Sequence, residues 1–182
     1  ALTMSLGIVL TGCGSSSNDS KSSTKKYTIA TDATYAPFEF KSGSGYKGID
    51  IDILSAIAKK ENFTYDLKPM NFNGIIPALQ AGQVDGSVSG MSITDERKQS
   101  LDFSNSYYDS GLCVVVKADN NSITKISEIK GKTVALKKGT AGATYAETNK
   151  DRLGLTLKYF DDSPSMFQAV TNGNADIALE DY

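Results

Sequence analysis

The stretch from Gly90 to Arg97, Gly-Met-Ser-Ile-Thr-Asp-Glu-Arg, has residue types suited to binding a small anion. A run that reads as a strand precedes it, and Thr94 predicts a short helix over 95–100 because its side chain can cap free backbone N–H groups. Such a helix start offers N–H groups and a positive dipole end, and Arg97 adds a planar fork of donors that matches a carboxylate. We expect a carboxylate pocket here. The alternative is that Arg97 is a solvated helix charge or pairs with a nearby aspartate.

Alternating strands and helices are predicted on both sides of this stretch. The strands are expected at 27–31, 64–70, 84–89, 112–117, 133–137, 155–160 and 175–179. The helices are expected at 50–62, 73–81, 126–129, 143–150 and 163–172. Residues 33–40 are expected to form a loop that leads into a Gly-rich turn at 42–48, and Pro77 is expected to be tolerable only near the first turn of its helix. The rhythm favours an α/β fold with mainly parallel sheets covered by helices.

The second half of the chain repeats the design of the first. Residues 78–85 and 169–176 share Ala, Gly and Asp in register, in a helix–Gly–x–x–Asp–strand pattern, and 28–32 has a counterpart in 133–137. The pattern predicts two lobes of similar design, with a ligand crevice outside the carboxyl ends of their strands.

That rule brings one set of residues to a common edge, with charged groups of both signs and two aromatic rings. The set is Asp32, the turn Gly90-Met91-Ser92, Arg97, Lys137, Gly139 to Ala141, Glu180 and Asp181, with Tyr35 and Phe72 on loops nearby. Each member alone could be a surface charge or core residue. Together they suit a zwitterion with a polar tail.

Composition excludes several kinds of chemistry. The 182 residues carry 19 basic and 21 acidic side chains and no His, so a Ser-His-Asp triad and His-ligated zinc are excluded. The near-balanced charge gives no sign of nucleic-acid binding. Two cysteines are too few for a Cys-only zinc site, and Cys113 is expected to be a buried hydrophobe. We expect no metal and no cofactor.

The N-terminus is a different kind of segment. Residues 1–10 are apolar and too short to cross a bilayer, and Leu10-Thr11-Gly12-Cys13 resembles the bacterial lipobox. We expect 1–12 to be the end of a lipoprotein signal peptide, Cys13 to be lipidated, and 13–26 to be a flexible linker that tethers the protein outside the cell membrane. The alternative is a lone Cys in a Ser-rich tract.

From Tyr27 to Tyr182 the chain resembles the polar amino-acid-binding proteins of bacterial ABC importers, solute-binding protein family 3, and most closely the glutamine-binding members. The matching segments are Ala30-Thr31-Asp32, Pro37-Phe38-Glu39-Phe40, Gly48 to Asp52, Gly74 to Leu79, Met91 to Arg97, Asp102-Phe103-Ser104 and Gly139-Thr140. The resemblance implies a two-lobed, type II periplasmic-binding-protein-like fold. It also implies an ABC permease in the membrane as the partner, and we expect a monomer.

Carried over by position, the resemblance implies that Arg97 grips the ligand α-carboxylate with the Ser92 backbone N–H. Gly90 carbonyl, the Ser92 hydroxyl and Asp181 would hold the α-ammonium. Asp32 and Lys137 would meet a side-chain amide, and Tyr35 and Phe72 would sandwich the aliphatic part.

Three positions depart from the glutamine-binding pattern. Ala141 replaces a Gly, Glu180 replaces a possible His, and Tyr35 replaces a Phe and adds a hydroxyl that needs a partner if buried. The charges favour glutamine as ligand, because Lys137 would repel a cationic tail and Asp32 would repel glutamate.

The expected mechanism is closure of lobe 1 (27–110) and lobe 2 (111–182) about a hinge near Ser110 to Leu112, driven by a ligand that binds both lobes. In the family the chain returns to lobe 1 after lobe 2, so we expect this sequence to be truncated at both ends. Three alternatives stay open. The first is a dehydratase-like enzyme that uses Glu180 or Asp181 as general acid. The others are a receptor sensor domain and a binding domain fused to a permease.

Overall fold

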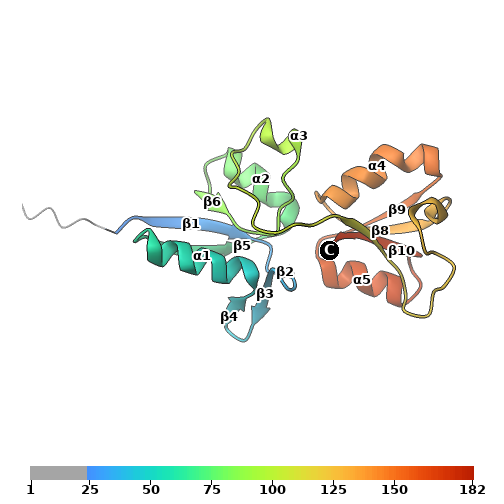
Figure 1. Ribbon diagram of the computed structural model, residues 1–182, viewed down its shortest axis with the longest axis horizontal. Coiled ribbons are helices and arrows are strands. Elements are labelled where there is room, and N and C mark those ends of the chain that lie inside the picture. Colours follow the sequence, from blue (N-terminus) through green and yellow to red (C-terminus); the bar gives the residue numbers. More distant parts are fainter. Residues whose placement is uncertain (1–23) are drawn as a thin grey trace, which may run out of the picture.

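Two α/β lobes lie side by side in the computed structural model, which describes residues 24–182 (Figure 1). The predicted signal peptide, the lipidation site Cys13 and most of the linker lie outside the described residues. In residues 24–182, no helix is both long and apolar enough to cross a membrane.

The sheet of the first lobe has the strand order β5-β1-β6 and is parallel throughout. Strand β1 spans Lys26–Thr31, β5 spans Thr64–Pro69 and β6 spans Gly86–Ser87. The third strand is shorter than the predicted 84–89, because only Gly86 and Ser87 pair in register with β1. Just before this strand, the Asp85 carboxylate accepts a hydrogen bond from the Thr28 backbone N–H, at 2.8 Å.

Helices cover both faces of this sheet, with α1 (Ile49–Lys60) on one side and α2 (Phe72–Gln80) on the other (Figure 1). The buried face of α2 includes Phe72, Ile75 and Ala78, which pack on Ala30 of β1. Pro77 is the sixth of the nine residues of α2, so the expectation that it needs the first turn was wrong. In so short a helix its missing N–H removes one hydrogen bond, to the carbonyl of Asn73, and burial of the apolar face outweighs that loss.

A small antiparallel sheet replaces the predicted loop and Gly-rich turn. It has strands β2 (Thr34–Tyr35), β3 (Glu39–Ser42) and β4 (Gly45–Lys47), in that order. Gly48 joins it to α1 with a φ of 127°, and a side chain there would overlap the Phe38 carbonyl. This position therefore requires glycine. The strands were missed because two to four residues are too few to establish an alternating pattern.

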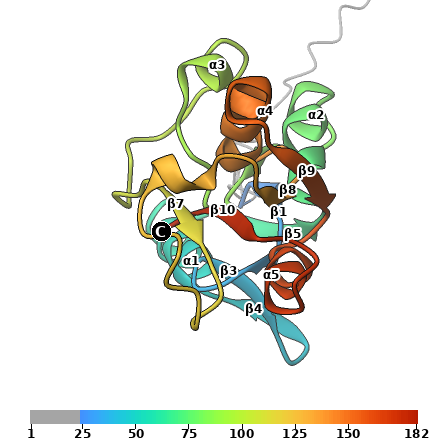
Figure 2. The same cartoon turned by 90° about the vertical axis from the view of Figure 1, so that its right-hand side faces the viewer.

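The second lobe has a four-stranded sheet in the order β7-β10-β8-β9 (Figure 2). Strands β8 (Thr133–Lys137), β9 (Thr156–Phe160) and β10 (Ile177–Asp181) are parallel, and β7 (Leu112–Val115) runs antiparallel to β10. Strand β10 begins and ends two residues later than predicted. Glu180 and Asp181 are therefore its last residues and do not follow it.

The core of the second lobe lies on both faces of the sheet. Helix α4 (Ala141–Leu153) packs with Val134 and Leu136 on one face, and α5 (Ser163–Thr171) packs with Ala135 and Ala178 on the other. The short 3₁₀ helix η1 spans Ile126–Ile129, as predicted. Alternation of large and small buried side chains along β8 therefore supports one helix on each face.

The predicted internal repeat is confirmed by matching hydrogen bonds. Asp85 accepts from the Thr28 N–H at 2.8 Å in the first lobe, and Asp176 accepts from the Thr133 N–H at 2.7 Å in the second. In both lobes the N–H of the same aspartate donates back to the carbonyl of the same threonine, at 2.9 Å. The same pair of hydrogen bonds is thus found at β1 in the first lobe and at β8 in the second.

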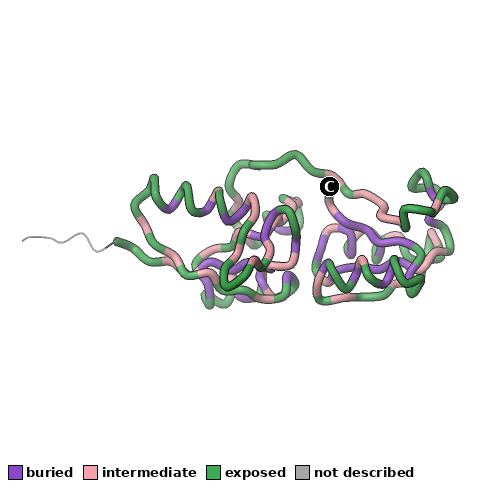
Figure 3. The backbone as a smooth tube through the Cα atoms, turned by 90° about the horizontal axis from the view of Figure 1, so that it is seen from below, coloured by how far each residue is buried: buried purple, intermediate pink, exposed green. Residues whose placement is uncertain are grey.

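Residues 99–111 run from the first lobe to the second, and the largely exposed segment is visible in Figure 3. Its end pairs with the end of β10, because the Tyr182 N–H donates to the Gly111 carbonyl at 3.1 Å and the Ser110 hydroxyl donates to the Tyr182 carbonyl at 2.8 Å. These paired residues lie where the hinge is predicted.

Candidate ligand-binding site

A buried ion pair connects the two lobes at the carboxyl ends of β1 and β8. Lys137 Nζ lies 2.7 Å from Asp32 Oδ2, and the two residues are only 2% and 5% exposed. Asp32 also accepts from the Thr34 hydroxyl at 2.9 Å, and Lys137 donates to the Ser163 hydroxyl at 3.0 Å. Both charges therefore have further hydrogen-bond partners, which buried ions require.

Two aromatic rings flank this ion pair. Lys137 Nζ lies 4.9 Å from the ring centre of Tyr35 and 5.4 Å from that of Phe72. The expectation that both rings are on loops was wrong. Tyr35 belongs to β2, and Phe72 is the first residue of α2, with a side chain anchored in the core. The extra hydroxyl of Tyr35 has the partner it needs, donating to the Asp181 carbonyl at 3.1 Å.

Arg97 lies in the short helix α3 (Asp95–Lys98), which Thr94 caps as predicted by accepting from the Arg97 N–H at 3.2 Å. The side chain is 9% exposed, so it is not a solvated helix charge. One guanidinium nitrogen donates to the Ser92 carbonyl at 2.7 Å and the other to the Gly139 carbonyl of the second lobe at 2.9 Å. Burial lowers the pKa of Arg97, and the charge of Asp181 acts in the opposite direction.

The turn Gly90-Met91-Ser92 contacts both Arg97 and the second lobe through Ser92. Gly90 has a φ of 50°, and a side chain there would meet the Tyr35 ring at 2.9 Å. Met91 packs against the core of the first lobe, and the Ser92 hydroxyl donates to Asp181 Oδ2 at 2.7 Å. The turn therefore holds Ser92 beside Asp181, the residue predicted to bind the ligand's ammonium group.

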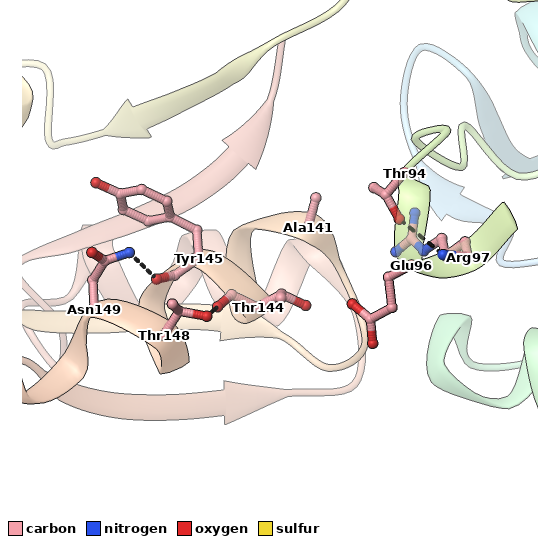
Figure 4. A pocket seen from close by; sticks show the side chains of 8 residues that line it. All are labelled: Thr94, Glu96, Arg97, Ala141, Thr144, Tyr145, Thr148 and Asn149. Carbon is pink, nitrogen blue, oxygen red and sulfur yellow. Dashed lines mark hydrogen bonds between the residues drawn. The ribbon is translucent and has the colours of Figure 1, made fainter. Parts of the chain in front are cut away.

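A cavity of about 300 Å³ lies where α3 faces the first half of α4 (Figure 4). Its lining comes from both lobes and consists of Thr94, Glu96, Arg97, Ala141, Thr144, Tyr145, Thr148 and Asn149. Two of the predicted site residues, Arg97 and Ala141, therefore lie on opposite walls of one cavity, whose volume is at the small end for small-molecule sites.

Glu180 adds a second carboxyl near the Asp32–Lys137 pair, at the end of the site predicted to hold the ligand's tail. It is 6% exposed and accepts from the Ser163 hydroxyl at 3.1 Å, and Ser163 in turn accepts from Lys137. Burial raises the pKa of Glu180, and the nearby charge of Lys137 partly offsets this. Sequence reasoning missed Ser163. Its position could have indicated it, because Ser163 follows β9, and the carboxyl end of β9 lies at the same edge of the sheet as those of β8 and β10.

All the predicted site residues among residues 24–182 lie on the facing sides of the two lobes or in the turn that supports them. One end offers Arg97, the Ser92 hydroxyl and Asp181, and the other offers Asp32, Lys137 and Glu180. Charges of both signs at both ends, separated by two aromatic rings, suit a small zwitterion with a polar tail. The role of each residue toward a ligand stays a prediction.

Comparison with known proteins gives a family and several relatives. The family model described as bacterial extracellular solute-binding proteins, family 3, matches residues 27–149. The arginine-binding extracellular protein ArtP of Bacillus subtilis is 42% identical over 131 residues, which is 72% of this chain and 51% of ArtP. The chain spans between 51% and 64% of the length of the first three curated relatives it matches.

Solved structures with the same fold include an ancestral arginine-binding protein bound to glutamine, which is 39% identical with a TM-score of 0.79. The match covers 86% of this chain and 69% of that one. The ancestral amino acid-binding protein AncCDT-1, a precursor of cyclohexadienyl dehydratase, is 38% identical with a TM-score of 0.79, over 86% of this chain and 70% of that one.

Proposed function

Because the chain belongs to family 3 of the bacterial extracellular solute-binding proteins, we propose that it captures a polar amino acid between its two lobes and delivers it to an ABC importer. The observation that carries the proposal is the set of bonds joining the lobes at both ends of one site. Lys137 binds Asp32, and Ser92 binds Asp181. When a ligand with a charged head and a polar tail enters, these groups can give up their bonds to one another and bind the ligand.

The main-chain groups of the ligand meet Arg97, Ser92 and Asp181. Arg97 already directs its two terminal nitrogens at carbonyl oxygens, 2.7 and 2.9 Å away. A ligand carboxylate offers a better acceptor to the same fork, because donor and acceptor then both carry a charge and two parallel bonds can form. Asp181 would exchange its Ser92 hydroxyl donor for the ligand ammonium.

The favoured ligand is glutamine. Asp32 and Lys137 together present one acceptor and one donor, which match the NH₂ and C=O of a side-chain amide. A cationic tail would meet the buried Lys137 charge, and glutamate would meet Asp32. The solved structure of a relative with glutamine bound supports this choice.

A cationic amino acid such as arginine is the second candidate, favoured by Glu180. When ionised, Glu180 gives the tail region two carboxylates against one ammonium, and the relative ArtP is named as arginine-binding. When protonated, Glu180 leaves the region neutral and favours the amide. Burial raises the pKa of Glu180 and the charge of Lys137 lowers it, so the preference should shift toward glutamine as the pH falls.

Isothermal titration of the full-length protein, freed of co-purified ligand, separates these candidates. Glutamine, glutamate, arginine and histidine are titrated in turn. Tight binding of glutamine with weak binding of the others supports the proposal. Tighter binding of arginine would be consistent with the roles of Arg97 and Asp181 but would contradict the roles given to Asp32 and Lys137. No heat of binding from any of the four amino acids would contradict amino-acid capture.

Closure is the proposed mechanism of capture. The ligand contacts residues from both lobes, so it binds the closed arrangement more tightly than the open one and shifts the population toward it. The paired residues Gly111 and Tyr182 lie at the crossing between lobes and would absorb the change in backbone angles. The closed form is then the one that docks on the permease.

We propose that a lipid on Cys13 anchors the protein to the outer side of the cell membrane. The sequence Leu-Thr-Gly-Cys supplies the acceptor, and two or more acyl chains give a stable anchor. Radiolabelled palmitate fed to cells should label the full-length protein but not its Cys13→Ser variant, and only the former should pellet with membranes. Equal labelling of both proteins would contradict the proposal.

We propose that the protein binds its ligand without converting it. An enzyme of dehydratase type is the alternative, because AncCDT-1, a precursor of a dehydratase, has the same fold. Glu180 is the acid that such a reaction would use, since burial raises its pKa. Incubation of the protein with each bound amino acid, followed by NMR of the solution, should return the amino acid unchanged. Formation of a product would support the enzyme.

A further inference from the structure

Two carboxyl side chains are completely buried together behind the candidate site. Glu39 of β3 and Asp50 of α1 are each 0% exposed. Glu39 Oε1 accepts from the Ser89 hydroxyl at 2.8 Å, and Oε2 has no N–H or O–H donor among residues 24–182. Asp50 lies beside Glu39, because its backbone N–H donates to the Phe38 carbonyl at 3.0 Å and its carboxylate accepts from Gly90, the residue after Ser89. A buried oxygen without a donor is costly, so this pair requires an explanation.

A single proton on Glu39 supplies that explanation. Two adjacent carboxylates cannot both ionise in a buried place, so one of them keeps its proton. Asp50 already accepts at both oxygens, from the Gly90 N–H at 2.6 Å and from the Tyr107 hydroxyl at 2.8 Å. A proton on Glu39 Oε2 turns the unpartnered oxygen into a donor toward Asp50. Burial, followed by repulsion from Asp50, raises the pKa of Glu39 to about 9.

This pair is connected to two of the predicted ligand contacts. The Ser89 hydroxyl that donates to Glu39 also accepts from the Asp32 N–H at 2.9 Å. Asp50 holds the N–H of Gly90 and thereby the turn that presents Ser92. It also holds Tyr107 in the segment that runs to the second lobe. Both ends of the site and the connection between the lobes therefore rest on one buried acid pair.

We propose that Glu39, as a protonated acid that donates to Asp50, is a positioning residue that sets Asp32 and the Gly90 turn for ligand binding. This inference rests on the proposed function and adds a pH limit to it. Loss of the proton places two anions side by side under the turn. Their repulsion weakens the hold of Ser89 on Asp32 and of Asp50 on Gly90, so affinity falls.

The other titratable side chains close to Glu39 are those of Asp50, Asp32, Tyr35 and Tyr107. Asp32 is paired with Lys137. The hydroxyls of Tyr35 and Tyr107 face the pair, and burial raises the pKa of each well above its ordinary value, so both stay neutral. Glu39 is therefore the group whose titration the experiment isolates.

The Glu39→Gln variant of the full-length protein is the informative one. Its amide keeps an acceptor for Ser89 and a donor for Asp50, but it cannot ionise. Glutamine affinity at pH 7 should match wild type within about threefold. Above pH 9 the wild-type dissociation constant should rise up to tenfold per pH unit relative to the variant, the limit in which only the protonated form binds. Titration of the ligand's own ammonium is common to both proteins and cancels in this ratio.

The exposed Glu61→Gln variant is the matched control, and its pH profile should follow wild type. Parallel profiles for Glu39→Gln and wild type up to pH 10.5, or a large loss of affinity in Glu39→Gln at pH 7, would overturn the proposal. A merely structural role for Glu39 would change affinity without changing the shape of the pH profile.

A second measurement needs no ligand and so separates this inference from the proposed function. The carboxyl carbons of glutamate are labelled with ¹³C, and the Glu39 signal is assigned as the one missing in Glu39→Gln. It should titrate near pH 9 in the ligand-free protein. Titration near 4.5, the ordinary value for Glu, would overturn the shared proton even if glutamine binds, and titration near 9 would support it even if glutamine does not.

Discussion

Lys137 Nζ lies 2.7 Å from Asp32 Oδ2, and the two residues occupy equivalent positions in the internal repeat. Residues 28–32 of the first lobe correspond to 133–137 of the second, so the repeat places opposite charges at the ends of its two first strands. Because those strand ends face each other across the lobes, one position of the repeat supplies both the acceptor and the donor for a ligand tail.

Replacing Lys137 by Met should convert the preference for glutamine into a preference for arginine. The variant loses a charged hydrogen bond to the amide, worth about 1.5–3 kcal/mol, or roughly 10- to 150-fold in glutamine affinity. It also removes the repulsion of a cationic tail. Isothermal titration of both amino acids measures the change. Lys138→Met is the matched control, since Lys138 is half-exposed and pairs with Asp161 at the surface. An unchanged ratio of the two affinities in Lys137→Met would contradict the tail assignment.

Replacing Arg97 by Ala should weaken every amino-acid ligand, because the α-carboxylate is common to all of them. The loss of a charged bidentate bond predicts a fall in affinity of one to two powers of ten or more. Arg97→Lys should recover only part of it, as an ammonium lacks the planar fork. The neighbouring Lys98→Ala, at an exposed position of α3, should bind like wild type. Equal titration curves for wild type and Arg97→Ala would rule out this role.

Replacing Asp176 by Ala should destabilise the protein by about 0.5–1.5 kcal/mol, the net value of one hydrogen bond, since the Thr133 N–H loses its protein acceptor. Asp176→Asn should recover part of the loss, because its amide oxygen can still accept. Chemical unfolding monitored by circular dichroism measures the effect. Asp66→Ala breaks an exposed ion pair with Lys26 and should cost less than about 1 kcal/mol. If Asp66→Ala and Asp176→Ala lowered the free energy of unfolding equally, the hydrogen bond of the repeated aspartate would contribute no more than an exposed ion pair.

The buried proton of Glu39 should make wild type more stable in acid than in base. The pKa of Glu39 is raised from 4.5 to about 9, so the folded chain keeps a proton that the unfolded chain releases above pH 4.5. Relative to Glu39→Gln, the free energy of unfolding should therefore fall by about 1.4 kcal/mol per pH unit between pH 4.5 and 9, and then level off. Urea unfolding of both proteins from pH 5 to 9 measures this difference, and a difference independent of pH would contradict it.

The long elements could be predicted from the sequence, and the short or tertiary ones could not. The spacing of apolar residues predicted α1, α2 and α5 to within a residue or two of their ends, and β8 at its observed limits. The small sheet β2-β3-β4 was missed because strands of two to four residues carry too little pattern. Strand β6 was predicted too long, since only Gly86 and Ser87 pair in register with β1.

The residues facing the site were predicted, whereas those that support them were not. Asp32 and Lys137 were identified because they follow or end a strand, and Arg97 was identified from its place in the motif Thr-Asp-Glu-Arg. Glu39 and Asp50 come from two different elements and meet only after folding. Nothing in the spacing of Glu39 and Asp50 predicts that the two side chains are buried side by side. In the sequence, each looks like an ordinary surface charge.

A crystal structure of the full-length protein with glutamine bound would show directly which residues hold the ligand. We expect glutamine between the lobes, with its α-carboxylate on Arg97 and Ser92, its ammonium on Asp181, and its amide between Asp32 and Lys137. The direct bond between Asp32 and Lys137 should then be longer than 2.7 Å or replaced by bonds to the ligand. Glutamine bound elsewhere, or in the reverse orientation with its amide on Arg97, would contradict the account.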